Sequence, residues 1–240
     1  MIIACTPTKN RGWTREFSVA CMKAQTRQPD LWVVVDNSSD SNDTWIGIGK
    51  DHPHVLYDRV EEPHTIGWMR NRCLDLALKA GAEYLVFWDD DDYYPPRRIE
   101  DAIAALEANP TAELAGSSKM YLLVLPENTL MTVGPYGANH STAATMVVRR
   151  RYAEVNRFNP EKERGEEFSF TKGWTASVAQ TSAETAIVAI GHHRNTVNKS
   201  QVVHKPRIFA AESVNDVNGK QVFRMRWPVQ WDLFRRTFSV

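Results

Sequence analysis

The sequence lacks a hydrophobic run long enough to cross a membrane. A transmembrane helix needs about 18 or more consecutive apolar residues, whereas the apolar runs of this 240-residue chain, such as residues 31–35 and 84–88, are short. Residues 1–5 are also too short for the apolar core of a signal peptide, and no basic residue precedes them. We therefore expect a soluble, cytoplasmic protein.

Cysteine is scarce in this chain. The three cysteines, Cys5, Cys21 and Cys73, occupy apolar positions of predicted strands and helices. An odd number at such positions indicates buried thiols in a reducing compartment and argues against a disulfide framework or a zinc site. Repeats and low-complexity segments are also absent, so the length favours one domain, or one core with an appendage.

Two glycine signatures of nucleotide-binding proteins are missing. No G-x-G-x-x-G follows the first predicted strand, and no G-x-x-x-x-G-K-[ST] occurs anywhere, so dinucleotide-dependent oxidoreductases and P-loop NTPases are poor interpretations. The net charge is zero, but residues 1–140 hold 13 Lys+Arg and 20 Asp+Glu while residues 141–240 hold 16 and 9. This division is compatible with an anionic substrate or partner, and equally with two halves that offset each other.

The sequence does contain an alternation of strands and helices over residues 1–110. Buried strands, recognised by short apolar runs, are predicted at residues 2–6, 31–35, 55–57 and 84–88. Helices, recognised by apolar residues at helical spacing, are predicted around residues 17–24, from Thr65 to a stop at Gly81, and over residues 99–106. This order predicts an α/β fold with a mixed, mainly parallel sheet of right-handed βαβ units flanked by helices.

The second half of the chain has a different pattern. Its predicted elements are an antiparallel hairpin of residues 122–125 and 130–133, a strand at 145–148, a helix near 169–178 and a buried strand at 186–190. From residue 196 the pattern is weak and rich in Trp, Phe and Arg. We predict that this last segment is a tail that packs on the domain or covers the site.

Four consecutive aspartates, residues 89–92, follow the strand predicted at 84–88. Acidic runs are often solvated turns, but like charges this close repel each other and favour a bound cation. Polar clusters also follow the first two strands, at residues 6–11 and 36–40. The carboxyl ends of parallel strands meet at one edge, where open α/β sheets bind ligands. We predict a nucleotide-sized crevice there with a hard cation such as Mg²⁺ or Mn²⁺.

These segments resemble glycosyltransferase family 2, inverting nucleotide-sugar transferases of the GT-A fold. Four elements occur in the family's order: Pro7 to Arg11, Gln25-Thr26 followed by residues 32–40, Gly67 with Arg70-Asn71, and residues 87–92 followed by Pro96. After residue 110 only Gly165-Glu166-Glu167 and the strand end His192-His193 can be placed. The resemblance implies metal-dependent transfer of a sugar from a nucleotide-sugar, with a UDP-sugar as first choice, to an acceptor hydroxyl.

The resemblance also implies roles for individual residues. The nucleotide-sugar site would consist of Thr6, Pro7, Thr8, Arg11, Asp36, Arg70, Asp89 and Asp90. Within it, Asp36 would accept a hydrogen bond from the base, and Arg70 would approach the diphosphate. Asp91 would be the direct ligand of Mn²⁺ or Mg²⁺, supported by Asp89 and by His193. Arg194 and Lys199 would fold over the diphosphate.

Inverting transfer further requires a general base that takes the proton of the acceptor hydroxyl. Glu167 stands where the family's Glu-Asp motif has its aspartate, so the resemblance implies Glu167 as the base, with Glu166 beside it as the alternative. Glutamate at this position is a departure from the family. The other interpretation is a pair of exposed glutamates that begin a helix.

On this basis residues 1–195 form a GT-A-like catalytic domain, with a nucleotide-binding half (1–110) and an acceptor half (111–195), and residues 196–240 form the tail. A nucleotidyltransferase and a non-catalytic nucleotide- or sugar-binding module are the alternatives. The acceptor stays open between a glycan, a small molecule, a protein hydroxyl and a hydroxylated nucleic-acid base, the last suggested by the basic run at residues 149–151. The oligomeric state is also open.

Overall fold

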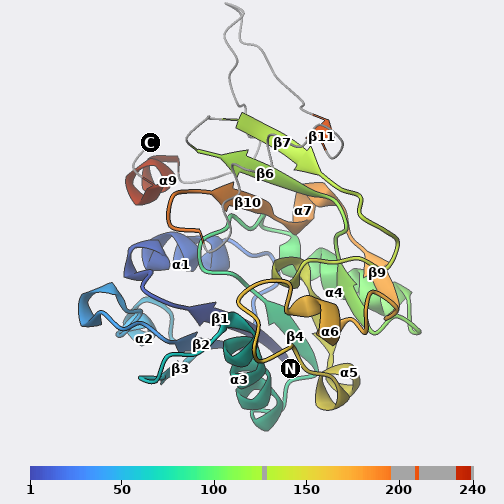
Figure 1. Ribbon diagram of the computed structural model, residues 1–240, viewed down its shortest axis with the longest axis horizontal. Coiled ribbons are helices and arrows are strands. Elements are labelled where there is room, and N and C mark those ends of the chain that lie inside the picture. Colours follow the sequence, from blue (N-terminus) through green and yellow to red (C-terminus); the bar gives the residue numbers. More distant parts are fainter. Residues whose placement is uncertain (126–128, 196–208, 211–230, 239–240) are drawn as a thin grey trace, which may run out of the picture.

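Four parallel strands form the centre of the fold. The computed structural model describes residues 1–125, 129–195, 209–210 and 231–238. In it, β1 (Ile2–Thr8), β2 (Leu31–Asp36), β3 (Val55–Arg59) and β4 (Tyr84–Phe87) lie in the order β3-β2-β1-β4 (Figure 1). Strand β8 (Val147–Arg149) pairs antiparallel with β4, and β5 (Leu114–Gly116) and β9 (Val178–Gln180) complete a mixed seven-stranded sheet. The predicted sheet is therefore confirmed.

Helices cover both faces of this sheet, which is why its central strands are buried throughout. On one face, α1 (Arg15–Lys23) and α4 (Arg98–Ala108) share a core with Ala4, Trp32 and Val86. On the other, α3 (Ile66–Lys79) and α5 (Arg150–Val155) share a core with Ile3 and Val33. Neighbouring residues of one strand thus serve opposite cores, as the two-residue period of a strand requires.

Helix α3 begins and ends at the residues that the sequence predicts. Thr65 is its N-cap, with the side-chain oxygen accepting a hydrogen bond from the backbone N–H of Trp68 at 3.2 Å. Gly81, with φ of 90°, follows its last turn. These two signals fix the position of Arg70 in the second turn, facing the carboxyl edge of the sheet.

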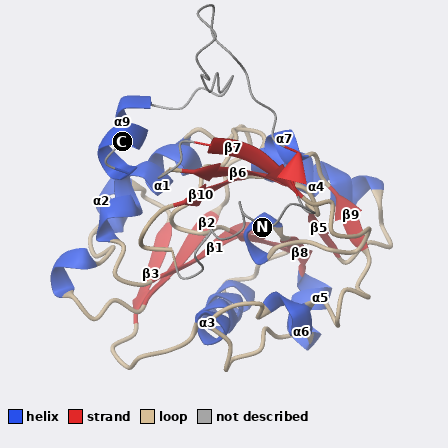
Figure 2. Cartoon of the chain, turned by 45° about the horizontal axis from the view of Figure 1, so that its top comes forward, coloured by secondary structure: helices blue, strands red, loops and turns tan. Residues whose placement is uncertain are grey.

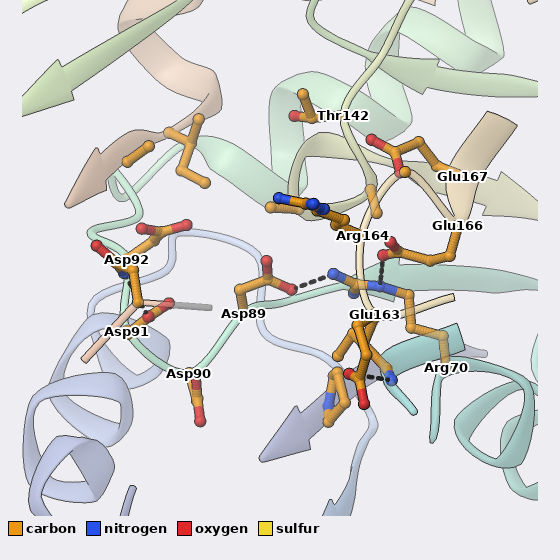
Figure 3. Close-up of a pocket in the computed structure, with 18 of the residues that line it drawn as sticks. Arg70, Asp89, Asp90, Asp91, Asp92, Thr142, Glu163, Arg164, Glu166 and Glu167 are labelled. Carbon is orange, nitrogen blue, oxygen red and sulfur yellow. Dashed lines mark hydrogen bonds and ion pairs between the residues drawn. The ribbon is translucent and has the colours of Figure 1, made fainter. Parts of the chain in front are cut away.

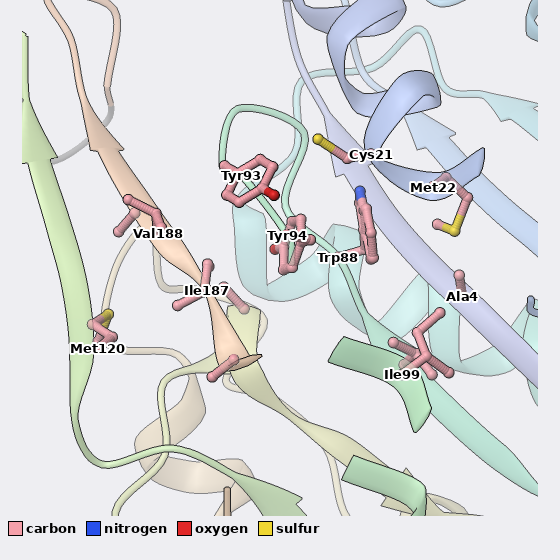
Figure 4. Packing of buried hydrophobic residues seen from close by; sticks show 14 of the residues in the cluster. Ala4, Cys21, Met22, Trp88, Tyr93, Tyr94, Ile99, Met120, Ile187 and Val188 are labelled. Atoms are coloured by element: carbon pink, nitrogen blue, oxygen red, sulfur yellow. The ribbon is translucent and has the colours of Figure 1, made fainter. Parts of the chain in front are cut away.

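A second sheet packs in the same core as α1 and α4 (Figure 2). It contains β10 (Val188–Gly191), β6 (Met120–Val124), β7 (Thr129–Val133) and β11 (Phe209–Ala210), in that order. The turn after β4 joins the two sheets, because Tyr93 pairs with Val188 and Tyr94 stacks on Trp88 with ring centroids 3.8 Å apart (Figure 4). This contact places the end of β10 beside the aspartate run.

The second half of the chain departs from the prediction in its short elements. The hairpin is present as β6 and β7, paired antiparallel. The helix predicted near residues 169–178 is wrong, because α6 (Glu167–Phe170) has a single turn and residues 172–174 all have positive φ. Strand β5, helix α5 and the single turns α2 (Ile48–Asp51) and α7 (Ala183–Ala186) are not predicted from the sequence. Each of these elements is too short to show a clear periodicity of apolar residues.

Part of the predicted tail can be placed. Helix α9 (Trp231–Phe238) packs on α1, with Phe234 and Phe238 at ring-centroid distances of 5.8 and 5.3 Å from Phe17. Most of residues 196–240, Lys199 included, lies outside the described residues, so the covering role of the tail stays a prediction. The three cysteines are buried, free thiols. Among the described helices, none has the length and apolar character needed to cross a bilayer.

Candidate active site

The carboxyl ends of β1 and β4 open into a pocket of about 300 Å³ (Figure 3). Both halves of the chain line it. The first half contributes Pro7, Arg11, Ile66, Arg70 and the four aspartates, and the second contributes residues 142–144, 163–167, Ile187, Ala189 and Asn195. The aspartate run therefore lies where the strand order predicts a ligand site.

Asp90 is held by the loop that follows β1. Its two carboxylate oxygens accept hydrogen bonds from Thr8 Oγ1 and from Arg11 Nη1, each at 2.6 Å. Burial raises the pKa of Asp90 to about 6, and the charge of Arg11 opposes this rise. The loop residues Thr8 and Arg11 thus fix the aspartate turn before any ligand arrives.

Asp91 contacts side chains of the opening loop and of the turn after β10. Its Oδ2 lies 2.8 Å from Arg11 Nη1, 3.0 Å from His192 Nε2 and 3.1 Å from Asn195 Nδ2. His192 and Asn195 belong to the turn that follows β10, so Asp91 joins the two sheets. The sequence predicts that a metal ion neutralises the negative charge of the aspartate run. In the structure, the positive charge of Arg11 neutralises part of it.

Asp89 and Asp92 have separate tasks. Asp92 Oδ1 accepts a hydrogen bond from the backbone N–H of Ile190 at 2.8 Å, which ties the aspartate turn to β10. Asp89 instead faces the pocket and forms an ion pair with Arg70 Nη2 at 2.9 Å. The run is thus divided among the opening loop, the second sheet and α3.

Arg70 is a buried cation placed between two carboxylates. Besides the pair with Asp89, its Nε donates to Glu166 Oε1 at 2.8 Å, and both charges hold its pKa above the ordinary value (Figure 3). In the described part of the chain, its buried Nη1 has no hydrogen-bond partner. A buried donor without a partner costs free energy. This nitrogen is therefore well placed to donate a hydrogen bond to an anionic oxygen of a ligand.

Glu166 and Glu167 differ in their surroundings. Glu166 is 5% exposed and pairs with Arg70, whereas Glu167 is half-buried on the pocket wall. Burial, followed by the charge of Glu166, raises the pKa of Glu167 to about 7. Of the two, Glu167 has the protonation behaviour of a general base at neutral pH.

Two residues that the resemblance implies for the nucleobase pocket point into the protein interior. Asp36 is fully buried and accepts hydrogen bonds from the backbone N–H groups of Ser38 and Trp45 and from Tyr57 Oη, at 2.7 to 2.9 Å. Thr6 Oγ1 accepts a hydrogen bond from Trp32 Nε1 at 2.9 Å. In the structure both side chains support the loops around the pocket rather than line it, and the role of Asp36 toward a base stays a prediction.

The histidine beside Asp91 is His192, not the predicted His193. The side chain of His192 is 3% exposed, while His193 is exposed to solvent. The chain turns immediately after β10, with the backbone N–H of His192 donating to Asn195 Oδ1 at 2.6 Å. This turn directs His193 outward, and the side chain of Asn195 that forms it is itself a site residue that the sequence pattern does not reveal.

A divalent cation fits this arrangement as a shared ion. Among the described residues, no group of three or more His, Cys, Asp or Glu side chains is arranged to hold a metal alone. However, Asp91 Oδ2 and His192 Nε2 face each other 3.0 Å apart as a hydrogen-bonded pair, so a shared cation would take the place of the proton between them. Oxygen and imidazole donors suit Mn²⁺. The pair therefore fits two positions, leaving the others to ligand oxygens or water.

The basic run at residues 149–151 lies away from the pocket and caps two helices. Arg149 donates to the carbonyls of Leu106, in the last turn of α4, and Ala112, and Arg150 donates to that of Leu78 in the last turn of α3. Arg151 pairs with Glu113. The arginines of this run are therefore engaged in contacts within the protein, and a nucleic-acid acceptor stays a prediction.

The fold and the carboxylate-lined pocket define the class of the protein, which is the GT-A fold. Among solved structures, S. aureus TarS 1-349 in complex with UDP-GlcNAc aligns with a TM-score of 0.61 and 18% identity over 88% of this chain and 62% of that one. Mannosyltransferase PcManGT from Pyrobaculum calidifontis, in complex with GDP-Man and Mn²⁺, aligns at 0.60 and 17% over 81% and 58%. The chain spans about three fifths of each of these structures.

The chain belongs to glycosyl transferase family 2, whose profile matches residues 3–132. No curated protein matches the sequence. The matched region contains the opening loop, Arg70 and all four aspartates, whereas Glu166, Glu167 and His192 lie beyond it. The family match therefore covers the wall of the pocket that comes from residues 3–132, and the remaining wall is known only from the structure.

Proposed function

We propose that this protein is an inverting, metal-dependent glycosyltransferase that moves a sugar from a nucleotide-sugar, with a UDP-sugar as first choice, to an acceptor hydroxyl. The observation that carries the proposal is the position of Glu167. This carboxylate, with a pKa of about 7, lines the same pocket as Arg70, Arg11 and the aspartate run. Membership of glycosyl transferase family 2 supports the proposal.

Glu167 is the general base in this proposal. It takes the proton of the acceptor hydroxyl while that oxygen attacks the anomeric carbon. The new C–O bond forms on one face of the sugar as the bond to the diphosphate breaks on the opposite face, and its electron pair stays on the diphosphate oxygen. Configuration at the anomeric carbon is therefore inverted.

Arg70 and Arg11 stabilise the diphosphate as negative charge develops on it. Arg70 has a buried Nη1 without a hydrogen-bond partner in the described residues, and its N–H groups can donate to a phosphate oxygen. Arg11 is 17% exposed and lies at the pocket end of the opening loop. Both cations are already held by aspartates, so they need little reorganisation during the reaction.

Asp91 and His192 are the residues that would hold Mn²⁺ or Mg²⁺, together with oxygens of the donor. When bound, the ion neutralises charge on the departing nucleoside diphosphate. Asp89 and Asp90 are assigned to the donor side of the same turn, with Pro7 and Thr8 beside them. Asp36 keeps its proposed role near the base through the loop that it organises.

The test is a donor screen with a defined product. Purified protein is incubated with UDP- and GDP-sugars, with Mn²⁺ or Mg²⁺, and with panels of glycans, small hydroxyl compounds, peptides and 5-hydroxymethylated oligonucleotides. Metal-dependent release of UDP or GDP, with an inverted glycosidic product, is expected. Release of pyrophosphate would instead identify a nucleotidyltransferase, and tight binding of donors without turnover would identify a binding module.

A further inference from the structure

His192 is enclosed by aromatic rings from distant parts of the chain. The ring of Trp13 meets it edge-on, with centroids 5.2 Å apart and planes at 89°. The ring of Phe238, the last residue of α9, lies 5.6 Å away at 44°. Trp13 and Phe238 also contact each other at 5.5 Å. The imidazole is thus packed by one residue before α1 and one from α9.

The polar side of the same imidazole faces the aspartate run. Nε2 lies 3.0 Å from Asp91 Oδ2, and Nδ1 accepts a hydrogen bond from the backbone N–H of Arg194 at 3.2 Å. The guanidinium of Arg194 in turn lies over Trp13, 5.3 Å from the ring centroid. Aromatic packing and hydrogen bonding therefore act on opposite sides of one ring and turn Nε2 toward Asp91. With Nδ1 as the acceptor, Nε2 carries the proton, so a divalent cation would bind Nε2 after the proton has moved to Nδ1 and the hydrogen bond from Arg194 has been given up.

Helix α9 is anchored by one apolar face. Leu233, Phe234 and Phe238 are buried, and the rings of Phe234 and Phe238 contact each other at 5.0 Å and both contact Phe17 of α1. Arg236 lies on the exposed face, 3.9 Å from Glu16. The helix can therefore be altered on its exposed face without disturbing the face that reaches His192.

We propose that Phe238 is a positioning residue for His192, and that its ring contact with the imidazole sets the affinity of the Asp91–His192 pair for a divalent cation. The inference rests on the metal site in the proposed function. A ligand imidazole must be held in one orientation, and partners behind a metal ligand typically change metal affinity about 10- to 100-fold. Phe238 closes the cage around this ring, so its loss frees the imidazole to rotate away from Asp91.

The experiment measures Mn²⁺ affinity of the full chain in the presence of UDP, from the electron paramagnetic resonance signal of free Mn²⁺. Phe238→Leu is expected to weaken binding about 10-fold or more, within the range for such partners. Phe234→Leu is the matched control, because it removes a similar ring from the contact with Phe17, and it should lower the melting temperature but keep the affinity. Arg236→Ala should change neither.

A double substitution separates positioning from general packing. His192→Ala alone should weaken Mn²⁺ binding, and adding Phe238→Leu should produce little further loss, because the residue on which Phe238 acts is gone. Additive losses, or unchanged affinity in Phe238→Leu, would overturn the proposal. If Asp91→Asn and His192→Ala both leave Mn²⁺ affinity unchanged, the proposed metal site itself fails, which is a different result from failure of Phe238 alone.

Discussion

Glu166 and Glu167 are adjacent residues with different chemistry. Arg70 holds Glu166 as an ion pair at 2.8 Å, which suits a structural carboxylate. Glu167 has a pKa of about 7, chiefly because of burial. Proton transfer is most efficient when the pKa of the base lies near the working pH. Glu167 has a longer side chain than the aspartate of the family, and its pKa suits the role of general base.

Replacing Glu167 by Gln should lower kcat by about 10²- to 10⁴-fold, the usual contribution of a general base. Binding of UDP should be retained, because the cations at the pocket are unchanged. Glu161→Gln, on the exposed loop before α6, is the control and should keep full activity. A larger loss of kcat in Glu166→Gln than in Glu167→Gln would reverse the assignment.

The activity should depend on pH through the same carboxylate. Since the base must be deprotonated, kcat should rise with pH through an apparent pKa near 7 and then level off. The negative charges of Glu166 and Asp89 raise this pKa and the charge of Arg70 lowers it. Glu166→Gln should therefore move the acidic limb of the kcat–pH profile to lower pH. A limb in the ordinary glutamate range in the unaltered protein would contradict the assignment.

At the scale of elements, the close approach of the loop 159–165 to the first turn of α3 positions both glutamates. The backbone N–H of Gly67 donates to the carbonyl of Lys162 at 3.1 Å. A Cβ at Gly67 would lie 1.9 Å from the carbonyl oxygen of Asn159, which is far inside contact distance. Only glycine therefore allows the loop to pack here. This close contact explains why the position of Gly67 in the family motif requires a residue without a Cβ.

Gly67→Ala should displace this loop and with it the start of α6. We expect a loss of about 1–3 kcal/mol in unfolding free energy, as for other overpacked sites, together with a drop in kcat. Gly49→Ala in α2 is the control, because nothing lies within 4 Å of its added Cβ. Urea unfolding and donor turnover measure the two effects, and a Gly67→Ala variant with normal values of both would refute the role of the loop.

Arg149 and Arg150 donate to carbonyls in the last turns of α4 and α3, whereas Arg151 pairs with Glu113 on the surface. Arg149→Met removes a donor from the carbonyls of Ala112 and Leu106, the second of which still accepts from the backbone N–H of Asn109, at a cost of about 1–3 kcal/mol. Arg151→Met, whose side chain is 56% exposed, should cost less than about 0.5 kcal/mol. Urea unfolding tests the difference. A strong, salt-dependent loss of oligonucleotide binding in Arg151→Met would support the nucleic-acid interpretation.

Prediction from sequence succeeds where periodicity or capping is strong. The strands before Asp36 and Asp89 and helix α3 with its Thr65 cap follow directly from such patterns. Contacts between distant segments are not encoded in any local pattern. The choice of His192 over His193 depends on a turn closed by Asn195, and the inward direction of Asp36 depends on Tyr57 from the next strand.

At the scale of the whole molecule, the two sheets beside the pocket are not complete within the residues that the family profile matches. Strand β8, which pairs with β4, and β10, which pairs with β6, both lie after residue 132. The aromatic core residues Tyr152, Phe158 and Phe170 lie there too. The first half of the chain therefore depends on the second half for its own packing.

A fragment of residues 1–132 should consequently fail to unfold cooperatively. It would expose the edge of β4 and the apolar residues that β10 covers, and exposed edges of this kind promote association. Thermal unfolding followed by near-ultraviolet circular dichroism, with the full chain as reference, measures this. A sharp transition together with UDP binding by the fragment would show that the first half is autonomous.

The pairing of Arg11 with Asp90 and Asp91 has a thermodynamic consequence for ligand binding. The positive charge of Arg11 weakens the attraction of the two carboxylates for a divalent ion that binds by itself. A diphosphate that binds by itself must compete with the same carboxylates for Arg11. A divalent ion held by the carboxylates would free Arg11 for a phosphate, and a phosphate held by Arg11 would free the carboxylates for the ion, so each would favour binding of the other. Metal and donor should then raise each other's affinity by the same factor, which titration calorimetry of each in the presence of the other would measure.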